Sequence, residues 1–144
     1  EYGKDYKFYY KIDRKSKLDR DEINDFEDKL KDTAASIKND LKKFYKEEFL
    51  MEVYDLDEKK LEKFADAKEM TLLQAKLYIG AMQNLRKELE NVKVTEGYEL
   101  TVTIIHKGNK LDEPLEQETT MYVYKVDGRW ICEESLEYVF SSMS

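Results

Sequence analysis

The chain has 144 residues and a formal net charge of -7 at pH 7, a length that fits one domain with its own hydrophobic core. Both halves are acidic and no basic stripe is present for a phosphate backbone, which disfavours nucleic acid as a partner. The sequence contains no apolar run of about 18 residues, so we expect no transmembrane segment.

The N-terminal part predicts a strand followed by a helix. Aromatic and apolar side chains alternate with polar ones over residues 6–12, which is typical of a short strand, and the charged run 13–21 is expected to link it to the helix. Asp19 or Asp21 can cap the helix, and Asp19 with Glu22 has the spacing of a capping box. Apolar residues then recur with a period near 3.6. The expected buried stripe is Ile23, Phe26, Leu30, Ala34, Ile37, Leu41 and Phe44 or Tyr45.

Two shorter helices are expected next. Asp57 can cap the first, and Thr71 with Gln74 forms a capping box for the second. Gly80, inside the second helix, costs about 1 kcal/mol relative to Ala, a cost that the close approach of another element or a pocket wall would explain. The expected stripes are Leu61, Phe64 and Ala65 in the first helix, and Leu73, Leu77, Ala81, Leu85 and Leu89, flanked by Tyr78 and Met82, in the second.

The region 92–106 predicts a long strand with one buried face, because every even position is apolar or aromatic until His106, with Glu96 as the exception. A turn at 107–110 and a second strand at 118–126 follow. Asp127-Gly128 predicts a type I′ hairpin that pairs Val126 with Arg129. One hairpin face then carries Tyr122, Tyr124, Val126 and Ile131, and the other carries Met121, Val123, Trp130 and Cys132.

The order of these elements predicts an α+β fold in a single domain, 1–144. We expect N-terminal helices packed on one face of a curved antiparallel sheet that the C-terminal half mainly forms. The parts are an N-terminal strand and connection at 1–18, a helical part at 19–91, a sheet at 92–135 and a tail at 136–144. The apolar tail could cover part of the sheet.

The segment 121–132, Met-Tyr-Val-Tyr-Lys-Val-Asp-Gly-Arg-Trp-Ile-Cys, resembles the closing hairpin of nuclear-transport-factor-two-like domains in the cystatin-like α+β superfamily. The resemblance implies helices against a concave sheet and dimerisation through the outer face. It also implies export or attachment to the cell envelope, rather than the cytoplasm, because many exported proteins and lipoproteins of Gram-positive bacteria carry such domains. It implies no activity, since the Asp/His pairs of the enzymatic members have no counterpart here.

Chemistry-bearing residues are sparse. His106 is the single histidine, so no histidine cluster can hold a metal. Cys132 has no evident base or cation beside it to lower its pKa. No glycine-rich phosphate loop is present. We therefore expect no cofactor and no catalysis; the alternative is a small isomerase or hydrolase that uses His106 with a pocket carboxylate.

The resulting hypothesis is a non-catalytic binding domain of an exported or cell-surface protein, with a small apolar pocket between helices and sheet for an amphipathic ligand or a peptide. The alternative is an interaction domain or homodimer that works through the outer sheet face, either through Tyr122 and Tyr124 or through Met121, Val123 and Trp130. The expected ligand-binding residues are Tyr78, Met82, Leu100, Val102, Ile104, Tyr122, Tyr124 and Trp130.

Overall fold

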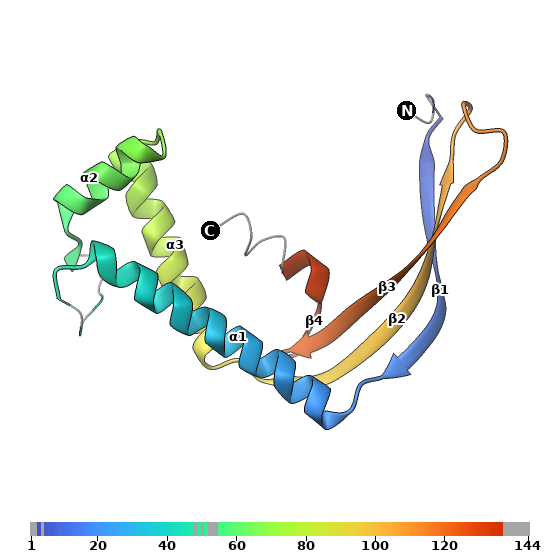
Figure 1. The fold of residues 1–144 in the computed structure, drawn as a ribbon, viewed down its shortest axis with the longest axis horizontal. Helices are drawn as coiled ribbons and strands as arrows, with labels where there is room; N and C mark the ends of the chain where they lie inside the picture. Colours follow the sequence, from blue (N-terminus) through green and yellow to red (C-terminus); the bar gives the residue numbers. More distant parts are fainter. Residues whose placement is uncertain (1–2, 4, 48, 50, 52–54, 137–144) are drawn as a thin grey trace. The chain divides into compact units, whose positions relative to one another are not determined.

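A computed structural model describes residues 3, 5–47, 49, 51 and 55–136. The described chain is α+β, and its three main helices precede three of its four strands, as the sequence predicted (Figure 1). None of the described helices combines the length and the apolar character needed to cross a bilayer. The elements are β1 (Lys7–Lys17), α1 (Arg20–Leu41), the 3₁₀ turn η1 (Lys42–Phe44), α2 (Glu58–Ala67), α3 (Leu72–Glu90), β2 (Val94–Lys107), β3 (Leu115–Val126) and β4 (Arg129–Cys132).

The chain divides into two compact units. Residues 1–25 and 93–144 form the first, which contains the sheet and the first residues of α1; residues 26–92 form the second, which contains α2, α3 and the rest of α1. These limits lie close to the expected boundary between a helical and a sheet part. The single folding domain expected from the sequence stays a prediction.

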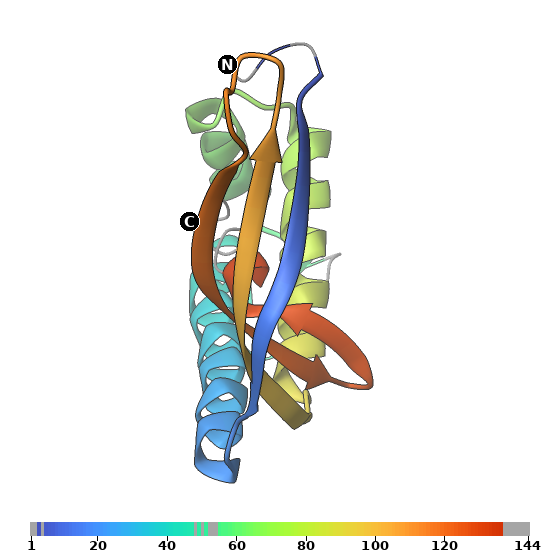
Figure 2. The same cartoon turned by 90° about the vertical axis from the view of Figure 1, so that its right-hand side faces the viewer.

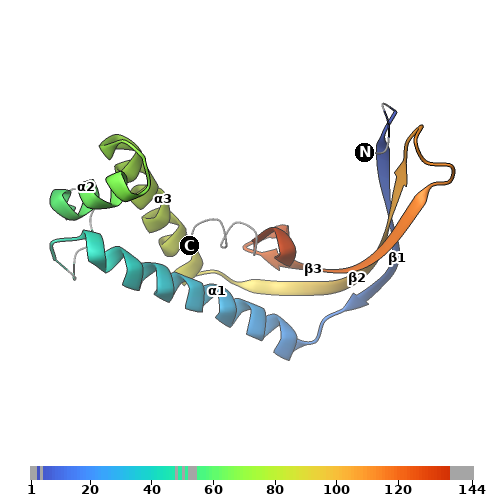
Figure 3. The same ribbon diagram turned by 45° about the horizontal axis from the view of Figure 1, so that its top comes forward.

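The sheet has the order β1-β2-β3-β4, and each neighbouring pair is antiparallel (Figures 2 and 3). The strand expected at 6–12 is confirmed, but it continues to Lys17, so the interpretation of the charged run as a linker is wrong. A bulge at Asp13 interrupts its pairing with β2. Because β1 is an edge strand with all eleven residues exposed, charged side chains fit either face without a desolvation cost.

The Asp-Gly hairpin has the register that the sequence predicted. Val126 pairs with Arg129, and Val123 pairs with Cys132. Asp127 and Gly128 have φ angles of 48° and 82°, the left-handed conformation that this two-residue turn requires. The tail residues Tyr138, Val139 and Phe140, which were expected to cover part of the sheet, lie outside the described residues.

The single apolar face expected over 92–106 is broken by a second bulge. Val94 pairs with Val126 and Glu96 pairs with Lys125, which leaves Thr95 as the extra residue. A one-residue insertion moves the following side chains to the other face. Val94 therefore shares a face with Tyr124, whereas the even positions from Glu96 onward lie on the opposite side of the sheet. The bulge immediately precedes Glu96, the one polar break in the alternation.

The helix caps are the ones that the sequence predicted. The side chain of Asp19 accepts a hydrogen bond from the Glu22 amide at 2.9 Å. Asp57 caps α2, and the capping box of Thr71 with Gln74 opens α3. The stripe expected in α1 is buried throughout, and it continues to Tyr45.

The buried face of α3 differs from the predicted stripe. Leu73 and Leu77 are each 65% exposed, and Gln83 and Arg86 are buried instead. Polar residues can occupy these positions because their groups are paired. Gln83 Nε2 donates to the Met51 carbonyl at 2.5 Å. Arg86 donates through Nε to Gln83 Oε1 at 3.0 Å, and it forms an ion pair with Glu90. Hydrophobic periodicity cannot reveal a core position that is occupied by a polar side chain with its groups hydrogen-bonded.

Gly80 does not mark a close approach. A Cβ built on it would meet no atom within 4 Å. The explanation by a neighbouring element or a pocket wall is therefore wrong for the described chain.

Candidate ligand groove

An apolar groove of about 370 Å³ lies on one side of the sheet. Its walls come from β1, β2 and β3, and we call this side of the sheet the groove face. The face owes its composition to the alternation of side chains along three paired strands. The lining residues are Phe8, Tyr10, Ile12, Leu100, Val102, Ile104 and Met121.

Strand register brings these side chains together. Tyr10 pairs with Ile104 and Ile12 pairs with Val102, so two apolar pairs stand side by side across β1 and β2. Leu100 pairs with Met121 across β2 and β3. Directly paired residues on one face have Cβ atoms about 5 Å apart, which makes the apolar surface continuous across the three strands.

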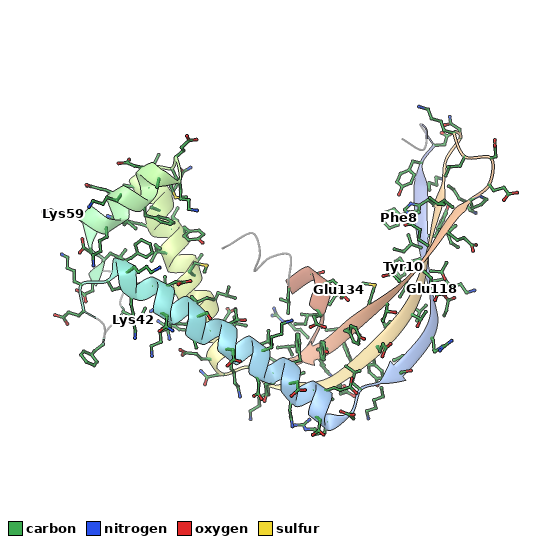
Figure 4. All side chains as sticks on the ribbon, in the orientation of Figure 1. Phe8, Tyr10, Lys42, Lys59, Glu118 and Glu134 are labelled. Carbon is green, nitrogen blue, oxygen red and sulfur yellow. The ribbon has the colours of Figure 1, made fainter. Side chains whose placement is uncertain are left out.

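The groove is buried at its floor and open at its edge. Val102 on the central strand is 4% exposed. On the edge strand Phe8 is 61% exposed, Tyr10 71% and Ile12 52%. Phe8 and Tyr10 project from the same side of β1 in Figure 4. Three neighbouring large apolar side chains that are more than half exposed form a patch of the kind that marks interaction sites on soluble proteins.

An aromatic cluster lies at the end of the groove nearest the start of β1. The ring of Tyr6 stacks on Phe8 at 6.4 Å and on His106 at 5.9 Å between centroids. Phe8 is the strand partner of His106. These contacts fix the rings that border the groove.

A second aromatic cluster lies farther along the same face, where β2, β3 and β4 run together. The rings of Tyr98 and Trp130 are 5.7 Å apart. Lys15 Nζ stands 4.1 Å above the Tyr98 ring, and Lys125 Nζ is 6.0 Å from the Trp130 ring and 3.8 Å from Glu96. Beyond the apolar groove, this end therefore offers cations held over aromatic rings.

Two neutral side chains contact His106. Its Nε2 is 3.2 Å from Gln117 Oε1, which can only accept, so Nε2 carries the proton in the neutral ring. Its Nδ1 then accepts from the Tyr6 hydroxyl at 2.8 Å. These two contacts do not supply the carboxylate partner that a His106-based enzyme would need.

Cys132 is held in its thiol form. Partial burial raises the pKa of the Cys132 thiol, and the nearby Glu134 carboxylate, which accepts a hydrogen bond from Sγ at 2.8 Å, raises it further. A thiol needs the opposite environment to act as a nucleophile. Across the described residues, no group of three or more His, Cys, Asp or Glu side chains is arranged to hold a metal ion.

The sheet's opposite face is closed around Tyr124. This side chain is buried, and it lies against Gly97, its partner on β2. Burial raises the pKa of Tyr124 to about 12, and the carboxylates of Glu133 and Glu22 add to the shift. Tyr124 therefore packs as a core residue of the first unit.

The sequence-predicted site residues fall into three groups. Leu100, Val102 and Ile104 line the groove, and Trp130 lies on the same face. Tyr122 and Tyr124 point to the opposite face, as their hairpin positions predicted. Tyr78 and Met82 belong to α3 in the second unit, where the Tyr78 ring stacks on Phe64 at 5.7 Å. A pocket between helices and sheet stays a prediction.

Sequence reasoning missed four lining residues. Phe8, Tyr10 and Ile12 were recognised as one face of a strand, but nothing in the sequence said which strand would pair with it. Met121 was assigned to the correct hairpin face. The pairing of β1 with β2 is a contact between residues about 90 positions apart, and it creates the groove by aligning two apolar alternations.

No family model, curated protein or solved structure matches the chain. Its arrangement of helices and a four-stranded antiparallel sheet is compatible with a nuclear-transport-factor-two-like fold.

Proposed function

We propose that this chain is a non-catalytic binding domain whose ligand site is the groove face. The observation that carries the proposal is the continuous apolar surface over β1, β2 and β3, left open where Phe8, Tyr10 and Ile12 stand more than half exposed. Covering each of these side chains would contribute about 1–2 kcal/mol of apolar burial. The ligand is therefore an apolar or amphipathic molecule, and the export of the protein stays a prediction.

Among the described residues, the groove lining contains no charged side chain. Polar groups near it include the hydroxyl of the lining residue Tyr10, the Tyr6 hydroxyl and His106 at one end, and the Lys15 ammonium over Tyr98 beyond the other end. This combination supports binding by apolar contact with polar groups at the ends of the groove. No catalytic role is proposed for His106, which contacts Tyr6 and Gln117, or for Cys132, whose thiol pKa is raised by partial burial.

The test is the affinity of the neutral apolar dye Nile red, measured by fluorescence titration. Tyr10→Thr combined with Ile12→Thr removes two exposed lining residues and keeps side chains that suit a strand. We expect about tenfold weaker binding, which corresponds to a loss of about 1.4 kcal/mol of apolar contact.

Tyr9→Thr is the matched control. Tyr9 lies on the same strand and is 48% exposed, but it points to the opposite face. Its replacement should leave Nile red affinity within about twofold of the parent. Equal losses in the two variants, or no binding by the parent chain, would contradict a ligand site in the groove.

A further inference from the structure

We infer that the ligand is an extended acidic polypeptide segment, which adds to the free edge of β1 as a fifth strand and places alternate apolar side chains beside the groove residues of β1. The inference rests on the proposed function, because it names the partner of the same site. Strand addition to a sheet edge combines main-chain hydrogen bonds with side-chain contacts at every second residue.

The first support is the unpaired edge of β1. This strand is the outermost of the sheet, and only its β2 side carries a ladder partner among the described residues (Figure 2). Its eleven residues are all exposed. A long exposed edge presents unpaired N–H and C=O groups to another chain.

The second support is the charge of β1. The strand carries five basic residues and one acidic residue, within a chain of net charge -7. Lys7, Arg14 and Lys17 form no ion pair with a described residue, and Lys11 has Asp13 at 3.5 Å. A partner with carboxylates would therefore meet basic side chains along this edge, three of which no described carboxylate pairs.

The third support is the distribution of these charges over the two faces. Three of the five basic residues, Lys7, Lys11 and Arg14, lie on the face opposite the groove, whereas Phe8, Tyr10 and Ile12 lie on the groove face. The other two, Lys15 and Lys17, lie on the groove face beyond the groove. In an added strand, side chains alternate in the same way. Alternate apolar and acidic residues would thus place the apolar side chains beside the groove and the carboxylates beside the basic residues.

A second copy of the chain is a poorer occupant of this edge. Pairing β1 with the β1 of another copy would set five basic residues against five. Lysine on an edge strand is a common protection against such self-pairing. The same basic residues attract an acidic strand. Electrostatic repulsion of a second copy and attraction of an acidic segment therefore favour the acidic segment as the partner.

The test uses a fluorescein-labelled ten-residue peptide that alternates Val and Glu, with a Val/Lys peptide of the same length as its counterpart. Binding is followed by fluorescence anisotropy at low ionic strength. We expect the Val/Glu peptide to bind at least about tenfold more tightly than the Val/Lys peptide, and added salt to reduce the difference.

Charge reversal on the strand tests the site. The triple variant Lys7→Glu, Lys11→Glu and Arg14→Glu should weaken binding of the Val/Glu peptide at least about tenfold. It should leave the affinity for Nile red unchanged. Neutral replacement of the same three residues by Thr keeps the strand propensity and should weaken binding of the Val/Glu peptide about threefold. Far-UV circular dichroism checks the fold of both variants.

The matched control reverses three exposed lysines of α2, Lys59→Glu, Lys60→Glu and Lys63→Glu. Lys59 is labelled in Figure 4. Both triple variants change the net charge equally, so a loss through overall repulsion would appear in both. We expect the α2 variant to keep peptide affinity within about twofold.

Backbone methylation separates strand addition from simple adsorption. Two Val/Glu peptides, N-methylated at the odd or at the even residues, each lose the N–H groups of one edge. Strand addition requires that one peptide loses binding and the other keeps it. Equal binding of the two peptides would overturn the inference.

Four further outcomes distinguish an acidic peptide from the other possible occupants of this surface. Nile red binding without a preference for the acidic peptide overturns this inference and leaves the proposed function standing. If the chain binds neither Nile red nor the acidic peptide, the proposed function and this inference are both overturned. Binding to phosphatidylglycerol vesicles without peptide binding would assign the surface to a membrane. A dimer in light scattering that Tyr10→Thr with Ile12→Thr dissociates would assign the surface to a second copy.

Discussion

At the scale of single residues, Gly97 in the sheet packs closely against two neighbouring side chains. A Cβ built there would lie 2.9 Å from Leu18 Cδ1 and 2.9 Å from Tyr124 Cδ1. The Gly97 carbonyl also accepts a hydrogen bond from the Leu18 amide at 2.9 Å. The missing side chain lets the aromatic ring pack against the β2 backbone, a pairing that is known to support glycines within sheets.

Gly97→Ala should therefore destabilise the protein. The added methyl group must displace both the Tyr124 ring and the Leu18 side chain, and overpacking of this kind costs about 1–3 kcal/mol. Urea unfolding monitored by circular dichroism measures the change. An unchanged free energy of unfolding would show that the contact is not tight.

The ionisation of Tyr124 predicts a loss of stability in alkali. Its pKa is about 12 in the folded chain, against 10.0 for an unburied tyrosine. The unfolded state therefore loses this proton first, so the stabilisation is complete below pH 10 and declines as the pH rises toward 12. The free energy of unfolding should fall less steeply over this interval in Tyr124→Phe than in the parent. Parallel slopes would contradict the shift.

At the scale of elements, α3 contains a glycine that no packing explains. Because Gly80 lies in a helix and a Cβ there would meet open space, Gly80→Ala gains helix propensity without a steric cost. We expect stabilisation by about 0.5–1 kcal/mol in the same urea experiment. The identical chemical change at Gly97 should have the opposite sign, and two changes of the same sign would contradict the packing assigned to these glycines.

Local sequence signals predicted the elements well, because caps and turns depend on a few adjacent residues. Asp19, Asp57 and Thr71 open the three helices, and Asp127 with Gly128 sets the hairpin register. The bulge at Thr95 could not be predicted in the same way. It depends on the pairing of β2 with β3, and its only local trace is the polar residue that follows it.

The exposed face of α3 was predicted wrongly for a different reason. Its buried side contains Gln83 and Arg86, whose cost of burial is offset by the Met51 carbonyl and by Glu90. A pattern search assigns such residues to solvent. It therefore places the leucine stripe, including Leu73 and Leu77, in the core, where the structure leaves them exposed.

At the scale of the whole molecule, the candidate site arises from a long-range pairing of two alternating sequences. The central part of the lining, Leu100, Val102 and Ile104, could be predicted from β2 alone. The contribution of β1 could not, because its pairing with β2 joins residues about 90 positions apart. The expectation that no basic stripe is present is wrong for this strand, which carries five basic residues in a chain of net charge -7. The combination of apolar groove and basic edge emerges only when the strands are placed side by side.

The central claim is that the groove face is the surface on which this chain binds its partner. Methyl-resolved nuclear magnetic resonance during titration with Nile red tests it most directly. We predict that the methyl signals of Ile12, Ile104 and Met121 shift together, while those of Ile131 on the opposite face stay in place. Shifts confined to Leu73 and Leu77 on α3, or shifts on neither face of the sheet, would contradict the claim.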